Sequence, residues 1–264
     1  MYKILYAHII SLLCIKPRTT VDLYRSTVFR LCIVTLSLFS IVCILARLAH
    51  SMRACLPRLD HLSREDFLAV YEPSDDTFLL CDALLNDLPH LLALAPTFCC
   101  EIGTGSGTVI TYLHQILKEH NYSAVYIATD LNPKACSIAA KTAKMNECRV
   151  DSLRMNFTES MLDRQIDVLI FNPPYVPTPN EEIAGSGIEI AWAGGEDGRV
   201  VIDRFIDQLD SMLSPKGVLY MILVQDNKPA EVRRILRRLG FLSAVVLQRK
   251  AVNEDLLVLK AWRA

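Results

Sequence analysis

Hydrophobic and polar positions after residue 60 follow two alternating patterns. Apolar runs of strand length lie at residues 98–100, 124–129, 150–155, 167–171 and 218–224. Elsewhere apolar residues recur every three or four positions, as on one face of a helix, at residues 79–94, 108–117, 132–143, 200–213 and 229–239. Strands that alternate with helices form a parallel sheet through right-handed crossovers. The pattern therefore predicts a three-layer α/β/α domain.

Smaller signals refine this prediction. Residues 243–248 and 255–262 predict a terminal hairpin, and Pro89 predicts a bend or split in the helix over residues 79–94. Residues 177–199 are rich in proline, glycine and acids, and a loop of this length favours a functional role. Two interpretations stay open for Trp192 in this loop: a packing anchor, or a part of the site.

The first 55 residues differ in character from the rest. Residues 31–46 carry no charge and lie between Arg30 and Arg47, whereas a membrane helix needs about 20 apolar residues, range about 17–25. Basic residues before this segment resemble those before a signal anchor. Two interpretations stay open for residues 1–55: a membrane anchor through residues 31–46, or a non-native extension upstream of a start at Met52.

Charge separates the same two parts of the chain. Residues 1–60 hold eight lysines and arginines against two acids, a net charge of +6. Because the whole chain carries −1, residues 61–264 carry −7. Phosphate contacts dominate the affinity of proteins for duplex nucleic acid, so the acidic domain argues against DNA as the main substrate.

The nine cysteines do not form a metal-site pattern, since none stands in a C-x-x-C pair. We therefore expect no metal ligands. Scattered cysteines in apolar surroundings are typical of a reducing compartment.

Candidate chemistry lies first at the end of the apolar run over residues 167–171. Asn172, Pro173, Pro174 and Tyr175 follow it, and the prolines must end the strand. The Asn172 side-chain oxygen and the Pro173 carbonyl could accept both hydrogens of a planar NH2 group, while Tyr175 could stack on that group. The alternative is an Asx-type turn with a surface tyrosine.

A second motif follows residues 98–100. Glu101 is followed by Gly103, Gly105 and Gly107, so the spacing is G-x-G-x-G rather than the G-x-G-x-x-G of dinucleotide-binding proteins. The next strand ends at Asp130, which could bind both ribose hydroxyls of a nucleoside. A glycine loop alone is weak evidence, whereas the loop, this acid and the Asn-Pro-Pro-Tyr turn, in that order, are strong evidence together.

This order resembles the class I S-adenosylmethionine-dependent methyltransferases with an (Asn/Asp)-Pro-Pro-(Tyr/Phe) motif. Residues 71–80, 171–179 and 187–195 are similar to the HemK family, and within it to the eukaryotic release-factor glutamine methyltransferases. That branch is also described as a DNA adenine or histone lysine methyltransferase. The resemblance covers residue 68 to the end, and it implies a Rossmann-like, mostly parallel seven-stranded sheet over residues 56–264.

The resemblance also implies how S-adenosyl-L-methionine binds. Glu101 and the Gly103, Gly105 and Gly107 loop would hold the methionine part, and Asp130 the ribose. Asn156 and Phe157 would hold the adenine, with Asn156 standing where the class usually has an acid. Thr77 would border the donor, although a helix-capping role alone remains open for it. Asn172 would contact both donor and acceptor, and the catalytic residues would be Asn172, Pro173 and Tyr175.

The function that we expect is methylation of a glutamine side-chain amide nitrogen in a translation release factor. The alternatives are a DNA adenine or a histone lysine as acceptor, or a non-catalytic scaffold. The resemblance adds a small zinc-binding activator subunit, which would form a heterodimer by adding a strand to the edge over residues 150–155. It also implies a cytoplasmic and nuclear location.

Overall fold

The computed structural model describes residues 55–159, 161, 163–183, 188–251 and 254–264, which belong to one unit, Cys55–Ala264. The predicted extension over residues 1–55, with its apolar segment 31–46, lies outside the described residues apart from Cys55.

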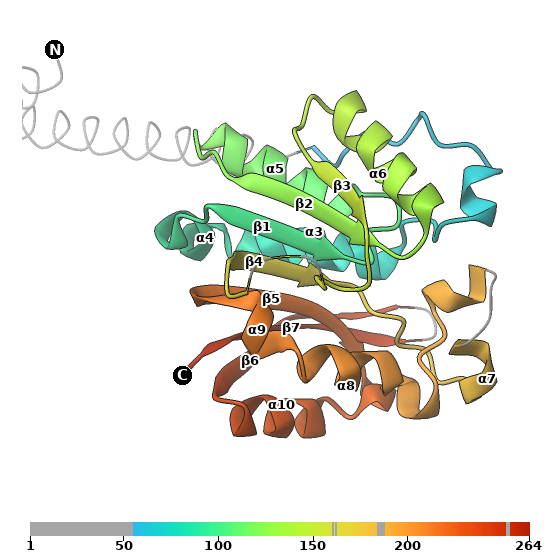
Figure 1. Cartoon of the computed structure of the whole chain (residues 1–264), viewed down its shortest axis with the longest axis vertical. Helices are drawn as coiled ribbons and strands as arrows, with labels where there is room; N and C mark the ends of the chain where they lie inside the picture. The colour runs from blue at the N-terminus through green and yellow to red at the C-terminus, as the bar shows by residue number, and fades with distance from the viewer. Residues whose placement is uncertain (1–54, 160, 162, 184–187, 252–253) are drawn as a thin grey trace, which may run out of the picture. The chain divides into compact units, whose positions relative to one another are not determined.

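A seven-stranded sheet with the strand order β3-β2-β1-β4-β5-β7-β6 runs through this unit (Figure 1). Its strands are β1 Phe98–Ile102, β2 Val125–Asp130, β3 Asp151–Arg154, β4 Ile166–Phe171, β5 Leu213–Val224, β6 Phe241–Lys250 and β7 Asp255–Arg263. Strands β1 to β5 pair in parallel, and β7 runs antiparallel to both β5 and β6. This arrangement confirms the predicted fold class and the terminal hairpin.

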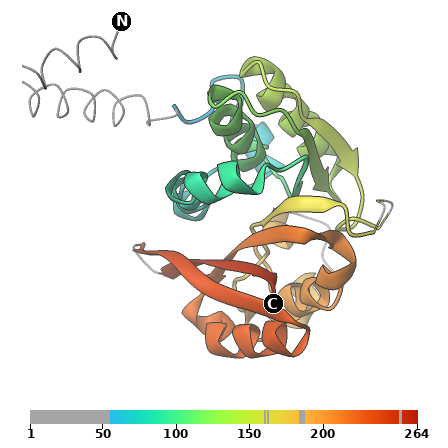
Figure 2. The same cartoon turned by 90° about the vertical axis from the view of Figure 1, so that its left-hand side faces the viewer.

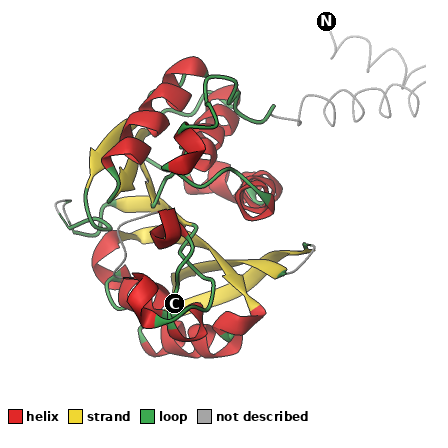
Figure 3. Cartoon of the chain, turned by 90° about the vertical axis from the view of Figure 1, so that its right-hand side faces the viewer, coloured by secondary structure: helices red, strands yellow, loops and turns green. Residues whose placement is uncertain are grey.

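Helices cover both faces of the sheet. They are α3 Asp75–Asn86, α4 Leu88–Leu94, α5 Thr108–Glu119, α6 Pro133–Met145, α7 Asn180–Ile183, α8 Val200–Ile206, α9 Leu209–Met212 and α10 Pro229–Arg238. From β1 the chain proceeds toward one edge of the sheet, through β2 to β3, and α5 and α6 connect these strands. From β4 it proceeds toward the other edge, and α8, α9 and α10 lie in these connections. Because crossovers are right-handed, the two groups lie on opposite faces, as the green and the orange helices of Figure 2 show. In Figure 3 the helices are red and the strands of the sheet between them are yellow.

Burial explains the sequence pattern of the central strand. All six residues of β4 are buried, because the strand lies between β1 and β5 with helices on both faces. Within the described ranges, no single helix is long and apolar enough to cross a membrane; α3 and α4 meet that criterion only as a pair bent by 63°. Their break falls at Asp87, so Pro89 occupies the second position of α4.

Two element boundaries differ from the sequence-based prediction. Residues 200–213 form α8 and α9 rather than one helix, and β5 starts five residues before the expected Val218. Leu213 pairs with Ile166 and Val218 pairs with Val168, so the intervening Pro-Lys-Gly segment forms a bulge. The proline and the glycine of this segment are typical of a turn, so the sequence predicts that the strand starts after them. The segment belongs to the strand because the residues on both sides of it pair with β4.

The long loop over residues 177–199 folds back on the Asn-Pro-Pro-Tyr turn. Its described part contains short helical turns at Asn180–Ile183, Ile188–Ala191 and Glu196–Gly198. Val176 forms an isolated parallel bridge with Ala193, and the Val176 N–H donates to the Trp192 carbonyl at 3.0 Å. The loop is therefore held against the end of β4.

Candidate active site

The site lies where the strand order reverses, between β1 and β4. Their last residues, Ile102 and Phe171, are paired neighbours, and ligands of open α/β sheets bind at this switch point. A cavity of about 900 Å³ opens there, within the usual size for small-molecule sites. The predicted site residues that line it are Thr77, Glu101, Gly103, Gly105, Asp130, Asn156, Phe157, Asn172, Pro173 and Tyr175.

Gly107 is the exception, because it does not line the cavity. Its φ is +75°, and a Cβ at this position would lie 2.7 Å from Cα of Ala139 in α6. The structure gives this glycine a conformational role: it lets the loop turn into α5 and lets the loop pack closely against α6, and its contact with a ligand stays a prediction.

Glu101 is buried beneath the glycine loop. Its Oε2 accepts hydrogen bonds from the Thr104 hydroxyl at 2.7 Å and from the Ile110 N–H at 3.2 Å. Burial raises the pKa of Glu101 to about 8, despite these two hydrogen bonds that favour the ionised form. A ligand ammonium beside this carboxyl group would favour its ionisation, which fits the amino group of a bound amino acid.

Asp130 connects the end of β2 to the glycine loop. Its two carboxylate oxygens accept from the Gly105 N–H at 3.0 Å and from the Asn132 N–H at 2.8 Å. Burial raises the pKa of Asp130, while these backbone bonds oppose that shift. Each oxygen keeps a further lone pair, so the side chain can still accept from two ribose hydroxyls.

Asn156 and Phe157 follow β3 at another part of the cavity. The Asn156 NH2 donates to the carboxylate of Glu159, which leaves the Asn156 side-chain oxygen as the acceptor for a base amine. Phe157 has a φ of +47°, uncommon for a bulky residue, and its ring packs edge-on against Phe171 and Phe205. The amide at position 156 thus retains an acceptor for adenine, without the charge of the usual acid.

The Asn-Pro-Pro-Tyr turn follows β4 directly. The Asn172 NH2 donates to Oδ2 of Asp76 at 2.9 Å. The Asn172 Oδ1 atom is buried and lacks a hydrogen-bond partner among the described residues. A buried acceptor without a partner is costly, so a bound NH2 group would satisfy it.

Tyr175 lies deeper than a surface tyrosine would. Its ring is buried, and its hydroxyl lies 3.2 Å from Oδ2 of Asp76 and 3.1 Å from Oε2 of Glu254. Burial, followed by these two carboxylates, raises the pKa of Tyr175 far above its ordinary value. The turn is therefore an anchored structure, and the alternative of an Asx-type turn with a surface tyrosine is wrong.

Thr77 both caps a helix and lines the cavity. Its hydroxyl accepts from the Ser74 N–H at 3.4 Å, which caps α3, and the residue also lines the cavity. Trp192 lies at the cavity rim with 36% of its surface exposed.

Several lining residues were not predicted from the sequence. Leu68, Val70 and Tyr71 border the cavity, and Val70 packs with Ala135 and Ile138 of α6. Asp76 in the first turn of α3 and Glu254 in the hairpin turn line it as well. The two consecutive acids before Thr77 could have indicated that Asp76 belongs to the site, whereas no local sequence pattern indicates this for Glu254.

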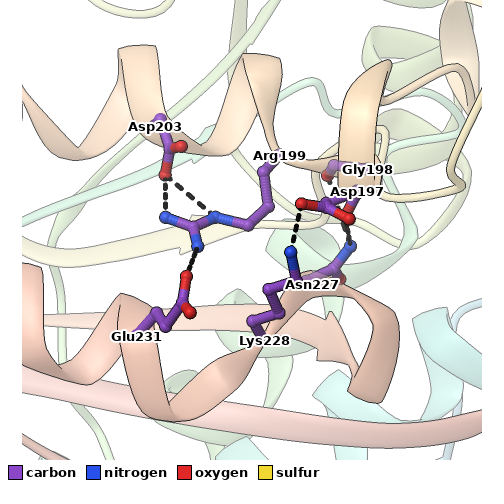
Figure 4. A network of polar contacts seen from close by, with 7 residues as sticks. All are labelled: Asp197, Gly198, Arg199, Asp203, Asn227, Lys228 and Glu231. Carbon is purple, nitrogen blue, oxygen red and sulfur yellow. Dashed lines mark hydrogen bonds and ion pairs between the residues drawn. The ribbon is translucent and has the colours of Figure 1, made fainter. Parts of the chain in front are cut away.

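A buried amide supports the site from behind. Asn227 is fully buried, and its NH2 donates to the carbonyls of Tyr175 at 2.8 Å and Asp197 at 3.0 Å. Figure 4 shows Asn227 with the contacts around residues 197–199, without Tyr175: Lys228 pairs with Asp197, and the guanidinium of Arg199 bridges Asp203 and Glu231. Residues 197–199 are thereby fixed beside the Asn-Pro-Pro-Tyr turn.

Comparison with known proteins agrees with this geometry. Residues 81–186 match the family described as Methyltransferase small domain. The chain is 39% identical over 203 residues to human Methyltransferase HEMK2, and this match covers 76% of this chain and 92% of the human protein. It is 38% identical over 221 residues to the eRF1 methyltransferase catalytic subunit mtq2 of Schizosaccharomyces pombe, and this match covers 78% of this chain and 95% of the yeast protein.

A solved structure is similar as well. The E. cuniculi Mtq2-Trm112 complex, described as responsible for methylation of the eRF1 translation termination factor, matches with 30% sequence identity and a TM-score of 0.54. The match covers 74% of this chain and 99% of the matched chain.

Proposed function

The chain belongs to the HemK family of S-adenosylmethionine-dependent methyltransferases, and on this premise we propose that it methylates the side-chain amide nitrogen of a glutamine in a translation termination factor. The relatives named as eRF1 methyltransferase and release factor glutamine methyltransferase support this acceptor.

The residues of the cavity fit the donor. Glu101 and the Gly103–Gly105 backbone would hold the methionine part, Asp130 the ribose, and Asn156 with Phe157 the adenine. When bound, the donor supplies a methyl group on a positively charged sulfonium, which needs no metal for activation. The protein's contribution is then to orient the acceptor, which is worth up to roughly 7–11 kcal/mol in well-aligned reactions.

The observation that carries the proposal is the buried Oδ1 atom of Asn172, for which the described part of the chain offers no hydrogen-bond donor. Together with the Pro173 carbonyl, this oxygen can accept both hydrogens of a planar NH2 group. An amide nitrogen is a poor nucleophile because its lone pair is delocalised, and two acceptors favour the pyramidal form that develops during attack. The amide proton can leave after methyl transfer, so the reaction does not require a buried general base.

The carboxylates around the turn favour an amide over a lysine. Asp76 and Glu254 both contact Tyr175 beside the acceptor position. Nearby carboxylates stabilise a protonated ammonium, which has no lone pair for attack. An adenine amine has the right geometry, but it must first be flipped out of the duplex. Residues 61–264 also carry a net charge of −7, which disfavours binding to the phosphates of DNA.

We also propose a heterodimer with a small zinc-binding activator subunit of the Trm112 type. Strand β3 lies at the edge of the sheet, and among the described strands it pairs with β2 alone. Leu153 in this strand is 40% exposed, and an edge strand with an exposed apolar side chain is suited to strand addition by a partner. The E. cuniculi relative, solved as a complex with Trm112, supports this assembly.

The function is tested by incubating the protein with labelled donor and three acceptors in parallel: a termination factor, a histone and duplex DNA. Label in the termination factor supports the proposal, and label confined to histone or DNA contradicts it. Calorimetric titration with the donor distinguishes an enzyme from a scaffold, since a scaffold would not bind it. The proposed acceptor implies a cytoplasmic and nuclear location, which cell fractionation tests.

A further inference from the structure

The Asp76 carboxylate has all of its hydrogen-bonding capacity committed at the catalytic turn. The side chain is 3% exposed and stands in the first turn of α3. Its Oδ1 accepts from the Thr77 N–H at 2.6 Å and from the Thr77 hydroxyl at 3.2 Å. Its Oδ2 accepts from the Asn172 NH2 at 2.9 Å and lies 3.2 Å from the Tyr175 hydroxyl. These contacts occupy the roughly four acceptor positions of a carboxylate.

We propose that Asp76 is a positioning residue for methyl transfer, which fixes the Asn172 amide with its oxygen directed at the acceptor nitrogen. An ionised carboxylate accepts hydrogen bonds and cannot donate them. It therefore selects the NH2 end of the Asn172 amide and turns Oδ1 away from itself. This role rests on the proposed function, in which Oδ1 of Asn172 accepts from the acceptor NH2.

The orientation matters because the two ends of an amide are nearly equal in shape and opposite in hydrogen bonding. A flipped Asn172 would present its NH2 to the NH2 of the acceptor, which places donor against donor. The flipped state would lose the acceptor that favours attack, and it would leave two buried donors unsatisfied. Neither Pro173 nor Pro174 has an N–H that could orient the amide instead.

The backbone makes the effect of D76N predictable. The Thr77 N–H cannot turn away, because it belongs to the first turn of α3. The oxygen of the amide introduced by D76N therefore stays on the Thr77 N–H, and its NH2 faces Asn172. The Asn172 amide then has to flip to accept that hydrogen bond. D76N thus preserves side-chain size and the contact with Thr77 while reversing Asn172.

A reciprocal exchange restores the pattern. N172D alone places two carboxylates in contact, where they repel or share a proton. In the D76N/N172D double variant, the introduced amide donates to the introduced carboxylate. The second oxygen of that carboxylate remains free to accept from the substrate NH2. If Asp76 had a purely structural role, the double variant would not have a higher kcat than the single variants D76N and N172D.

The test compares wild type, D76N, N172D and D76N/N172D for kcat and for the dissociation constant of the donor. D75N is the matched control, since Asp75 is the exposed acid of the same helical turn. We expect D76N to lower kcat by about 10²–10³, the usual effect of losing one preorganised hydrogen-bonding group, with donor affinity unchanged. The double variant should exceed both single variants in kcat, and D75N should match wild type.

Three results would overturn the role of Asp76: D76N with wild-type kcat, a double variant no better than its components, or a loss of donor affinity and thermal stability in parallel with rate.

A measurement without acceptor separates failure of this role from failure of the proposed function. In nuclear magnetic resonance spectra of the donor-bound protein, with N172A as the assignment reference, the Asn172 NH2 signals should be protected from exchange in wild type and lose protection in D76N. Protection retained in D76N contradicts the proposal whatever the acceptor is, whereas a wild type that does not label a termination factor contradicts only the proposed function.

Discussion

The side-chain amide of Asn227 donates a hydrogen bond of 2.8 Å to the backbone carbonyl of Tyr175, which precedes it by 52 residues. Asn227 ends the short helical turn Gln225–Asn227 that follows β5, and its own oxygen accepts from the Val224 N–H at 2.8 Å. The last strand of the parallel part of the sheet therefore holds the catalytic turn that follows β4.

Replacing this NH2 by an acceptor should loosen the turn. N227D places a carboxylate oxygen against the carbonyls of Tyr175 and Asp197, and unsatisfied buried groups cost about 1–3 kcal/mol or more when charged. We expect a lower urea midpoint and a lower kcat. Q225E makes the same chemical change at an exposed neighbour and should alter neither. Wild-type stability in N227D would show that the hydrogen bond to Tyr175 is unimportant.

Donor binding should depend on pH through Glu101. Because burial raises its pKa to about 8, the carboxyl group is protonated near pH 6, and pairing with the donor ammonium requires its ionisation. Binding then releases a proton, so donor affinity should rise with pH toward 8, by at most about tenfold per pH unit.

Calorimetry on E101Q provides the control for this pH dependence. The variant cannot ionise at position 101, so it should bind more weakly and without the rise between pH 6 and 8. The donor's own amino group titrates near 8 in both proteins, so the difference between them isolates Glu101. Equal pH profiles would exclude Glu101 as the partner of the ammonium.

The short motifs were predictable because their signals are local. Proline ends β4 before Tyr175, and glycine gives the tight loop after β1, so the residues of both motifs could be assigned from composition and spacing. Asp76 and Glu254 could not, because they reach Tyr175 from 99 and 79 residues away. Their contacts depend on how α3 and the β6–β7 hairpin pack on the sheet, which hydrophobic periodicity does not specify.

The edge of the sheet provides a test of the proposed heterodimer. Leu153 of β3 and Leu239 after α10 are both 40% exposed, but only Leu153 lies on the β3 edge. L153D should abolish copurification with a Trm112-type subunit, because a charge on the pairing surface must be desolvated on binding. L239D should copurify like wild type. Equal behaviour of the two variants would place the partner elsewhere, and a monodisperse, fully active protein made alone would remove the need for a partner.

The segment before Met52 should be dispensable for catalysis. All predicted site residues lie after it, from Thr77 to Tyr175, within the unit Cys55–Ala264. A protein that starts at Met52 should fold and methylate with wild-type kcat. Circular dichroism checks folding separately, so a folded but inactive truncation would show that the segment contributes to the reaction.

Asn172 should be essential for transfer and dispensable for donor binding. N172A removes the amide oxygen that would accept from the acceptor NH2, and loss of such a group costs about 10²–10³ in rate. The dissociation constant of the donor should stay near the wild-type value, because Glu101 and Asp130 are untouched. Turnover above about a tenth of wild type, well outside that range, would mean that Asn172 does not hold the acceptor.

Tandem mass spectrometry of a termination factor incubated with enzyme and labelled donor tests the central claim most directly. We predict one labelled methyl group on a glutamine side-chain nitrogen, no label when that glutamine is changed to alanine, and no label with N172A. A methyl group on a lysine or on another atom of the factor, or a termination factor left unlabelled while histone or DNA is labelled, would contradict the account.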